Sequence, residues 1–131
     1  MKFAKVVFWI AGVWGVLVIA PLFFLIDTVS RQAPPAITHP EFYYGFADVT
    51  LMWQIAFFVI ALDPERYRAM MIPPAVAKFG WAILVTTLYL QGRISSGQLM
   101  FGASDFTLAV LFVAAFIKTR PQVEDGYLLR E

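Results

Sequence analysis

Four long apolar stretches, separated by short polar or charged segments, dominate the chain. They run over residues 6–26, 45–62, 73–90 and 97–117. A helix of about 20 apolar residues crosses the roughly 30 Å hydrocarbon core of a bilayer. The pattern therefore predicts an all-α, polytopic membrane protein. In this prediction residues 1–118 form a single four-helix transmembrane bundle, and residues 119–131 form a polar cytoplasmic tail.

The first apolar stretch has features of a secretory signal peptide, because Lys2 and Lys5 precede it. A signal peptide, however, has an apolar region of only about 7–15 residues, followed by small residues at a cleavage site. Here the stretch is longer and ends in the bulky segment Leu22-Phe23-Phe24-Leu25-Ile26. We therefore expect an uncleaved first transmembrane helix.

The distribution of basic residues predicts the orientation of the bundle. Two of them, Arg31 and Arg93, fall on the side of the first and third connections. The opposite side carries Lys2, Lys5, Arg66, Arg68, Lys118, Arg120 and Arg130. Because cytoplasmic segments of membrane proteins are enriched in Lys and Arg, both termini are expected in the cytoplasm and the protein in the inner (plasma) membrane.

The connections carry recognisable start and stop signals. In the outer connection, residues 27–44, the prolines of Ala33-Pro34-Pro35-Ala36 and His39-Pro40 favour extended, polyproline-like backbone. In Asp63-Pro64-Glu65-Arg66-Tyr67-Arg68, an Asp followed by a Pro is typical of a helix start, which predicts a short interfacial helix over residues 64–71. Ser95 or Ser96 is expected to cap the fourth transmembrane helix.

Composition narrows the chemistry further. The chain has 131 residues, 60% of them hydrophobic and 15% charged, with no cysteine and one histidine. The absence of cysteine excludes a disulfide framework, a thiolate metal site and a cysteine nucleophile. The single His39 excludes a multi-histidine metal centre within one chain, and a net charge of +1 gives no case for nucleic-acid binding. No nucleotide, zinc-protease or haem-attachment motif is present, so the sequence assigns no catalytic residue and leaves any cofactor unknown.

The ionisable Lys78 and Asp105 and the polar Gln54 fall in the middle of predicted spans, and Asp48 lies near the start of the second. An ionisable group at bilayer depth costs about 2.5–3.5 kcal/mol on insertion scales. Counted from the turn near Arg93, the levels of Lys78 and Asp105 differ by about 5–6 Å, so an ion pair between the two side chains is geometrically possible. Side chains lean toward the N-terminus of their own helix, however, which would direct these two away from each other.

Two interpretations of this group remain open. In the structural one, Lys78 extends to the cytoplasmic headgroups and Asp105 accepts interhelical hydrogen bonds. The donors of those bonds would be Thr50, Gln54, Thr86 or Thr87. In the functional one, Asp105, Lys78 and Gln54 form the polar floor of a ligand-binding pocket or a proton site.

A second polar group, His39, Glu41 and Asp48, is expected at the outer mouth of the bundle. One imidazole and two carboxylates would suit a divalent cation, or a general base beside a bound substrate. In the alternative interpretation these residues only solvate the loop, while Tyr43 and Tyr44 anchor the helix at the membrane interface.

Two features of the first apolar stretch concern packing. Trp9 and Trp14 are five residues apart, which places them on different faces of a helix. Ala11-x-x-x-Gly15 is a pattern of small residues that permits close approach of a second helix, either inside the bundle or in a homodimer.

The segment Asp63-Pro64-Glu65-Arg66-Tyr67-Arg68, together with Lys78, Arg93 and Asp105, carries a family resemblance. From residue 42 to residue 119 the layout resembles the DoxX-like small four-helix bacterial membrane proteins. The resemblance implies an inner-membrane bundle with cytoplasmic termini, in a group that includes subunits of quinone-linked or redox complexes. Asp105 with His39 and Glu41 also resembles, more loosely, the emopamil-binding and sigma-two-receptor-like group, which implies a sterol-like ligand. Neither resemblance assigns a catalytic residue.

Three classes of function are compatible with these features. The best supported is a non-catalytic accessory subunit or a binder of an apolar ligand such as a lipid, a quinone or a sterol-like molecule. The second is a proton- or ion-coupled small transporter or channel that acts as an oligomer through Asp105. The third is a membrane enzyme acting on a lipid or quinone through His39, Glu41 or Asp48. The expected partners are the lipid bilayer and either further copies of the chain or a larger membrane complex.

Overall fold

Helices and their connections make up the whole described part of the chain, residues 2–121 of a computed structural model. The elements in order are α1 (Lys2–Ile19), the 3₁₀-helix η1 (Ala20–Phe24), α2 (Ile26–Gln32), α3 (Pro40–Leu62), the 3₁₀-helix η2 (Arg68–Met71), α4 (Ile72–Leu90) and α5 (Ser96–Lys118). The all-α prediction is therefore confirmed.

Four helical segments, each of 23 residues, are long and apolar enough to cross a membrane. They are Lys2–Phe24, Pro40–Leu62, Arg68–Leu90 and Ser96–Lys118. The start of α1 and the end of α5 lie together, since Lys118 Nζ is 4.1 Å from the centre of the Phe3 ring. The protein is thus a multi-pass membrane protein in which the start of the first span and the end of the last span lie at the same end of the bundle.

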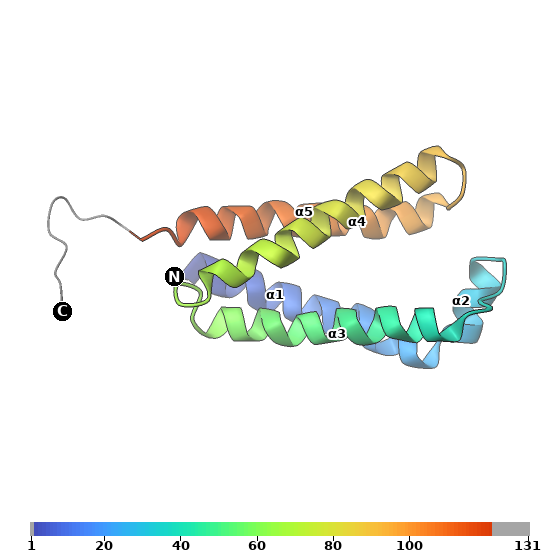
Figure 1. Ribbon diagram of the computed structural model, residues 1–131, viewed down its shortest axis with the longest axis horizontal. Helices are drawn as coiled ribbons and strands as arrows, with labels where there is room; N and C mark the ends of the chain where they lie inside the picture. The colour runs from blue at the N-terminus through green and yellow to red at the C-terminus, as the bar shows by residue number, and fades with distance from the viewer. Residues whose placement is uncertain (1, 122–131) are drawn as a thin grey trace, which may run out of the picture.

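The four spans form two antiparallel helical hairpins, α1 with α3 and α4 with α5 (Figure 1). Glycines allow the helices of each hairpin to approach closely. In the first hairpin Gly12 lies against the Phe58 ring and Gly15 against the Gln54 side chain. In the second, a Cβ on Gly102 would be 3.1 Å from Val85. Gly15, the second small residue of the Ala11-x-x-x-Gly15 pattern, therefore packs against α3 inside the bundle.

The two hairpins meet at the end that holds the start of α1, here called the closed end. Phe8 on α1 stacks on Phe112 on α5 with ring centroids 4.5 Å apart. Phe57 on α3 contacts both rings edge-on, at 5.9 and 5.1 Å. This aromatic cluster and its small neighbours form the buried core of the bundle.

At the opposite end, here called the open end, the two hairpins diverge (Figure 1). This end carries α2 and the turn between α4 and α5, in which Gly92 adopts a positive φ of 71° and so ends α4. Phe46 on α3 and Trp81 on α4 stack at 5.7 Å and connect the hairpins partway along the bundle. Beyond them Phe42 and Phe101 are mostly exposed.

The outer connection differs from its prediction. Residues 26–32 form α2, and only residues 33–39 are non-helical. The backbone N–H of Ala33 donates to Val29 O, and the N–H of Ile37 donates to Ser30 Oγ at 3.1 Å, so this connection folds on itself. The second span, α3, begins at Pro40 and not at residue 45, because proline fits the first turn of a helix, where its missing N–H is not needed.

Two further expectations concern the other connections. The predicted short helix over residues 64–71 is present only in part: Asp63 Oδ1 accepts from the Arg66 N–H as a helix start would, residues 64–67 form turns, and the 3₁₀-helix η2 covers residues 68–71. The cap of α5 is Ser95, which exchanges two hydrogen bonds with Gln98 in a capping box. Of the predicted tail, residues 122–131 lie outside the described residues.

Candidate functional site

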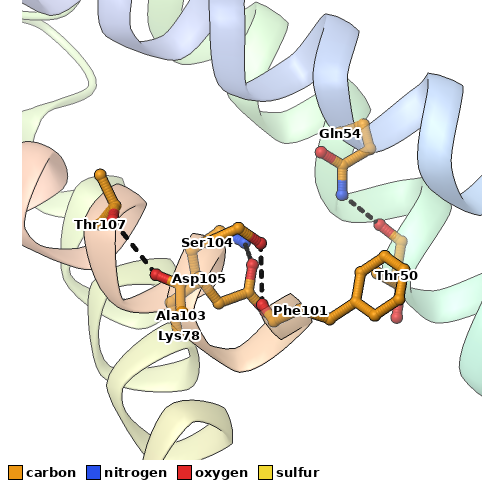
Figure 2. A network of polar contacts seen from close by, with 8 residues as sticks. All are labelled: Thr50, Gln54, Lys78, Phe101, Ala103, Ser104, Asp105 and Thr107. Atoms are coloured by element: carbon orange, nitrogen blue, oxygen red, sulfur yellow. Dashed lines mark hydrogen bonds and ion pairs between the residues drawn. The ribbon is translucent and has the colours of Figure 1, made fainter. Parts of the chain in front are cut away.

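An ion pair joins the two helices of the second hairpin. Lys78 Nζ on α4 donates to Asp105 Oδ1 on α5 at 2.7 Å (Figure 2). The side chains are 17% and 25% exposed, so the pair is largely enclosed by protein but still accessible. Both residues lie well inside segments that are long and apolar enough to span the membrane.

The pair forms despite the expected lean of both side chains. The tilt toward the helix N-terminus applies only to the Cα–Cβ bond. The long, flexible lysine side chain spans the offset of about 5–6 Å between Lys78 and Asp105 along the helix axes. Extension of Lys78 to the headgroups is therefore wrong as a description of this structure, because its ammonium group binds Asp105.

Packing at and beside the level of the pair holds its two helices together. Phe79, next to Lys78, contacts Phe106, next to Asp105, edge-on at 5.7 Å. Toward the open end, Gly102 lets Val85 come close to the backbone of α5. The pair thus lies beside an aromatic contact and near a close helix approach, both within the second hairpin.

Neighbouring polar side chains do not share the carboxylate. Thr86 and Thr87 donate to Ala82 O and Ile83 O of their own helix. On α5, Ser104 and Thr107 likewise donate to Phe101 O and Ala103 O (Figure 2). The prediction that threonines or Gln54 donate to Asp105 is wrong, since Lys78 is the polar partner of Asp105 within residues 2–121.

Hydrogen-bond donors and acceptors of the pair that are not used within the described residues can bind another molecule. An ammonium group has three donors and a carboxylate has two acceptor oxygens. Only one Lys78 donor and one Asp105 oxygen are used within the described part of the chain. The pair can therefore present donors and an acceptor side by side to a hydroxyl or carbonyl group.

Gln54 belongs to a different place in the molecule. Its Nε2 donates to Thr50 O at 2.7 Å, and its side chain, 4% exposed, fills the space above Gly15 between α1 and α3. Figure 2 shows Gln54 and Thr50 apart from the ion pair. The structure therefore brings together Lys78 and Asp105 but does not bring Gln54 to them.

The predicted outer cluster is only partly assembled. His39 Nδ1 lies 3.3 Å from Glu41 Oε1, and both side chains are more than half exposed. Because α3 starts at Pro40, Glu41 and Asp48 are two helical turns apart, about 10 Å along the axis. Asp48 makes no hydrogen bond or ion pair with any described residue, and no group of three or more His, Asp or Glu among residues 2–121 is arranged to hold a metal ion.

Three other arrangements did not follow from the sequence. Trp9 and Trp14 border one exposed, nearly flat apolar surface of α1, which Ile10, Val13 and Leu17 complete. The Tyr43 hydroxyl donates to Leu22 O at 2.7 Å.

The third arrangement closes the second hairpin on η2. Arg68 Nε donates to Phe116 O at 3.0 Å, with the guanidinium 3.6 Å from the centre of the Phe116 ring. The sequence does not predict this contact, because Arg68 and Phe116 are 48 residues apart.

Comparison with known proteins adds no relative: no protein-family model, no curated protein and no solved structure matches the chain. The DoxX-like resemblance therefore stays a prediction, and the site is interpreted from its own geometry.

Proposed function

We propose that this chain is a non-catalytic integral membrane protein that binds an apolar ligand carrying one polar group, with Lys78 and Asp105 as the polar contacts. The observation that carries the proposal is the accessible ion pair inside two membrane-spanning helices, with donors and an acceptor left over. Quinones, sterol-like molecules and lipids with a hydroxyl or carbonyl group have this chemistry.

The energetic argument rests on the surroundings of the pair. In hydrocarbon, each polar group without a partner costs several kcal/mol, since no water is present to bind it. The free donors of Lys78 and the second oxygen of Asp105 are therefore stabilised by a ligand that is itself soluble in the bilayer. Phe101 and Phe106, both exposed on α5 near the pair, provide apolar surface for the rest of such a ligand.

The proposal places the protein in the inner membrane with both termini in the cytoplasm. It is supported by seven basic residues on the side of the termini against two on the other. It is also supported by the contact of Lys118 with Phe3, because the start of α1 and the end of α5 then share one membrane side. The DoxX-like resemblance implies the same location.

Native mass spectrometry of protein extracted gently from its own membranes tests the proposal. The experiment compares the unaltered protein with the double variant Lys78→Met, Asp105→Leu, which replaces both charged side chains by apolar ones. We expect a bound small molecule of defined mass on the unaltered protein and its loss from the double variant.

The matched control is Thr107→Val, which removes a hydroxyl that bonds only to its own helix. This variant should keep the small molecule. Equal binding to the double variant, or no bound molecule beyond bulk phospholipid, would contradict the proposal. A homo-oligomer without ligand would instead favour the coupled transporter or channel, and proton flux in liposomes would then be measured with Asp105→Asn.

A further inference from the structure

Asp48 is an ionisable residue inside a membrane-spanning helix that has no hydrogen-bond or ion-pair partner among residues 2–121. It lies on α3, within the apolar segment Pro40–Leu62. Its side chain is exposed, and it makes no hydrogen bond or ion pair with any residue from 2 to 121. Such residues in membrane spans pair with other groups as a rule, because an isolated charge there is costly.

A comparison with Asp105 shows what is missing. Asp48 lies eight residues after the start of α3 at Pro40, and Asp105 lies nine residues after the start of α5 at Ser96. At about 1.5 Å per residue, each acid is about 12–14 Å from the outer end of its helix. For Asp105 the chain supplies Lys78 at 2.7 Å, but none of the described residues supplies a cation for Asp48.

The face of α3 that carries Asp48 is turned away from the bundle. Gly45, Asp48, Met52 and Ile55 follow each other at spacings of three and four residues and are all exposed. A Cβ added to Gly45 would have no atom within 4 Å. A glycine next to a polar residue on an exposed helix face permits close approach of a second transmembrane helix.

Charge argues against a second copy of this chain as the neighbour. A symmetric contact through this face would bring Asp48 against Asp48, and like charges at that distance repel. Lys78 is already paired, and the other basic residues among residues 2–121 lie in connections or near helix ends. These are Lys2, Lys5, Arg31, Arg66, Arg68, Arg93, Lys118 and Arg120. A second copy in the same orientation therefore offers no cation at the depth of Asp48.

We propose that the exposed face formed by Gly45, Asp48, Met52 and Ile55 binds a transmembrane helix of a different membrane protein, whose Lys or Arg pairs with Asp48. The basic residue lies about 12 Å from the outer end of its own span, level with Asp48. Oppositely charged side chains in neighbouring spans neutralise each other, and this makes the contact specific as well as favourable. This inference does not depend on a ligand at Lys78 and Asp105.

A photo-crosslinking amino acid at Met52, one turn from Asp48, tests the contact in the membranes of the source organism. The same amino acid at Ile83, which is exposed on α4, is the matched control position. We expect the probe at Met52, and not the one at Ile83, to capture one protein with a Lys or Arg in a transmembrane span. In the Asp48→Leu background the captured amount should fall about thirtyfold or more, as for loss of one partner of a charge pair.

Charge exchange then separates pairing from a merely structural role. Asp48→Lys should abolish capture, and a change of the partner's basic residue to Asp should restore it. Asp48→Leu should leave the unfolding of this protein in detergent unchanged, since Asp48 has no contact within the bundle. Capture of a second copy, capture of lipid alone, capture that persists in Asp48→Leu, or destabilisation of the isolated protein by Asp48→Leu would each overturn the proposal.

Discussion

The closed and open ends of the bundle are held together in different ways. At the closed end, Phe112 of α5 contacts Phe8 and Phe57 of the first hairpin, so the contacts join one hairpin to the other. At the open end, contacts such as Tyr43 with Leu22 and Gly102 with Val85 stay within one hairpin. The hairpins thus depend on the closed end for their association. Toward the open end, the stacking of Phe46 on Trp81 joins them.

This difference shows where a membrane bundle can place a polar site. Lipid tails are as apolar as the helix surfaces, so close packing rather than exclusion from water holds the helices together. Packing is concentrated at the closed end, in a core cluster to which Lys78 and Asp105 do not belong. A ligand can therefore bind at the pair without competing with the contacts that maintain the fold.

The largest effect is expected from breaking the closed end. Phe112→Ala removes a fully buried ring in contact with two others. It should lower the free energy of unfolding by about 3 kcal/mol, because the surroundings of a large cavity relax only partly. Unfolding in mixtures of mild detergent and SDS, followed by circular dichroism, measures the change.

The matched variant at the open end is Phe101→Ala, which truncates the same residue type on the same helix. Because Phe101 is 56% exposed, its loss should change the free energy of unfolding by only about 0.5 kcal/mol. Equal effects of the two variants would show that the ends do not differ as described.

Breaking the ion pair from one side should have the next largest effect. Lys78→Met leaves Asp105 without its partner and should cost about 2 kcal/mol, as should Asp105→Leu. The double variant should recover most of this loss, because neither charge is then left alone. A double-mutant cycle from the same unfolding assay gives the coupling energy; additive losses would mean that the pair does not act as a unit.

Filling a helix interface should have a smaller effect. Gly15→Ala places a methyl group where the Gln54 side chain lies, and it should destabilise the protein by about 1–2 kcal/mol through overpacking. Gly80→Ala, where nothing lies within 4 Å, should be neutral or stabilising by up to about 1 kcal/mol, since alanine is the better helix former. If both variants behave alike in the unfolding assay, close packing at Gly15 is refuted.

The smallest effect should come from the open end of the first hairpin. Tyr43→Phe removes the hydrogen bond to Leu22 O and should cost about 1 kcal/mol. The loss should be local, with faster amide hydrogen exchange in residues 20–32 and unchanged exchange around Phe57. A uniform increase over all helices would mean that this bond supports the whole bundle.

Much of the fold could be predicted from the sequence because each span is a long apolar run bounded by charged residues or proline. α2 could not, since the seven residues Ile26–Gln32 include Asp, Thr, Ser and Arg, a composition also typical of loops. The start of α3 depends on whether Pro40 is taken as a helix start or as extended backbone, and both are compatible with its fixed φ.

The sequence predicted the positions of the site residues along the helix axes, but not the contacts that their side chains make. The rise per residue places Lys78 and Asp105 within reach of each other, whereas the rotamer that joins them depends on the packing of α4 against α5. The Gln54 side chain ends in a polar amide, and nothing in its position along the sequence shows that it fills the space above Gly15. The separation of Asp48 from Glu41 follows only once α3 is known to begin at Pro40.

The division into two hairpins has a consequence for the order of events during synthesis. The first hairpin has its own interface, with Gly12 against Phe58 and Gly15 against Gln54. All four residues precede α4 in the chain and so leave the ribosome before it does. Domains and subdomains fold from the N-terminus as the chain is made. Phe112 is among the last span residues to be made, so the aromatic cluster closes only when the second hairpin is complete.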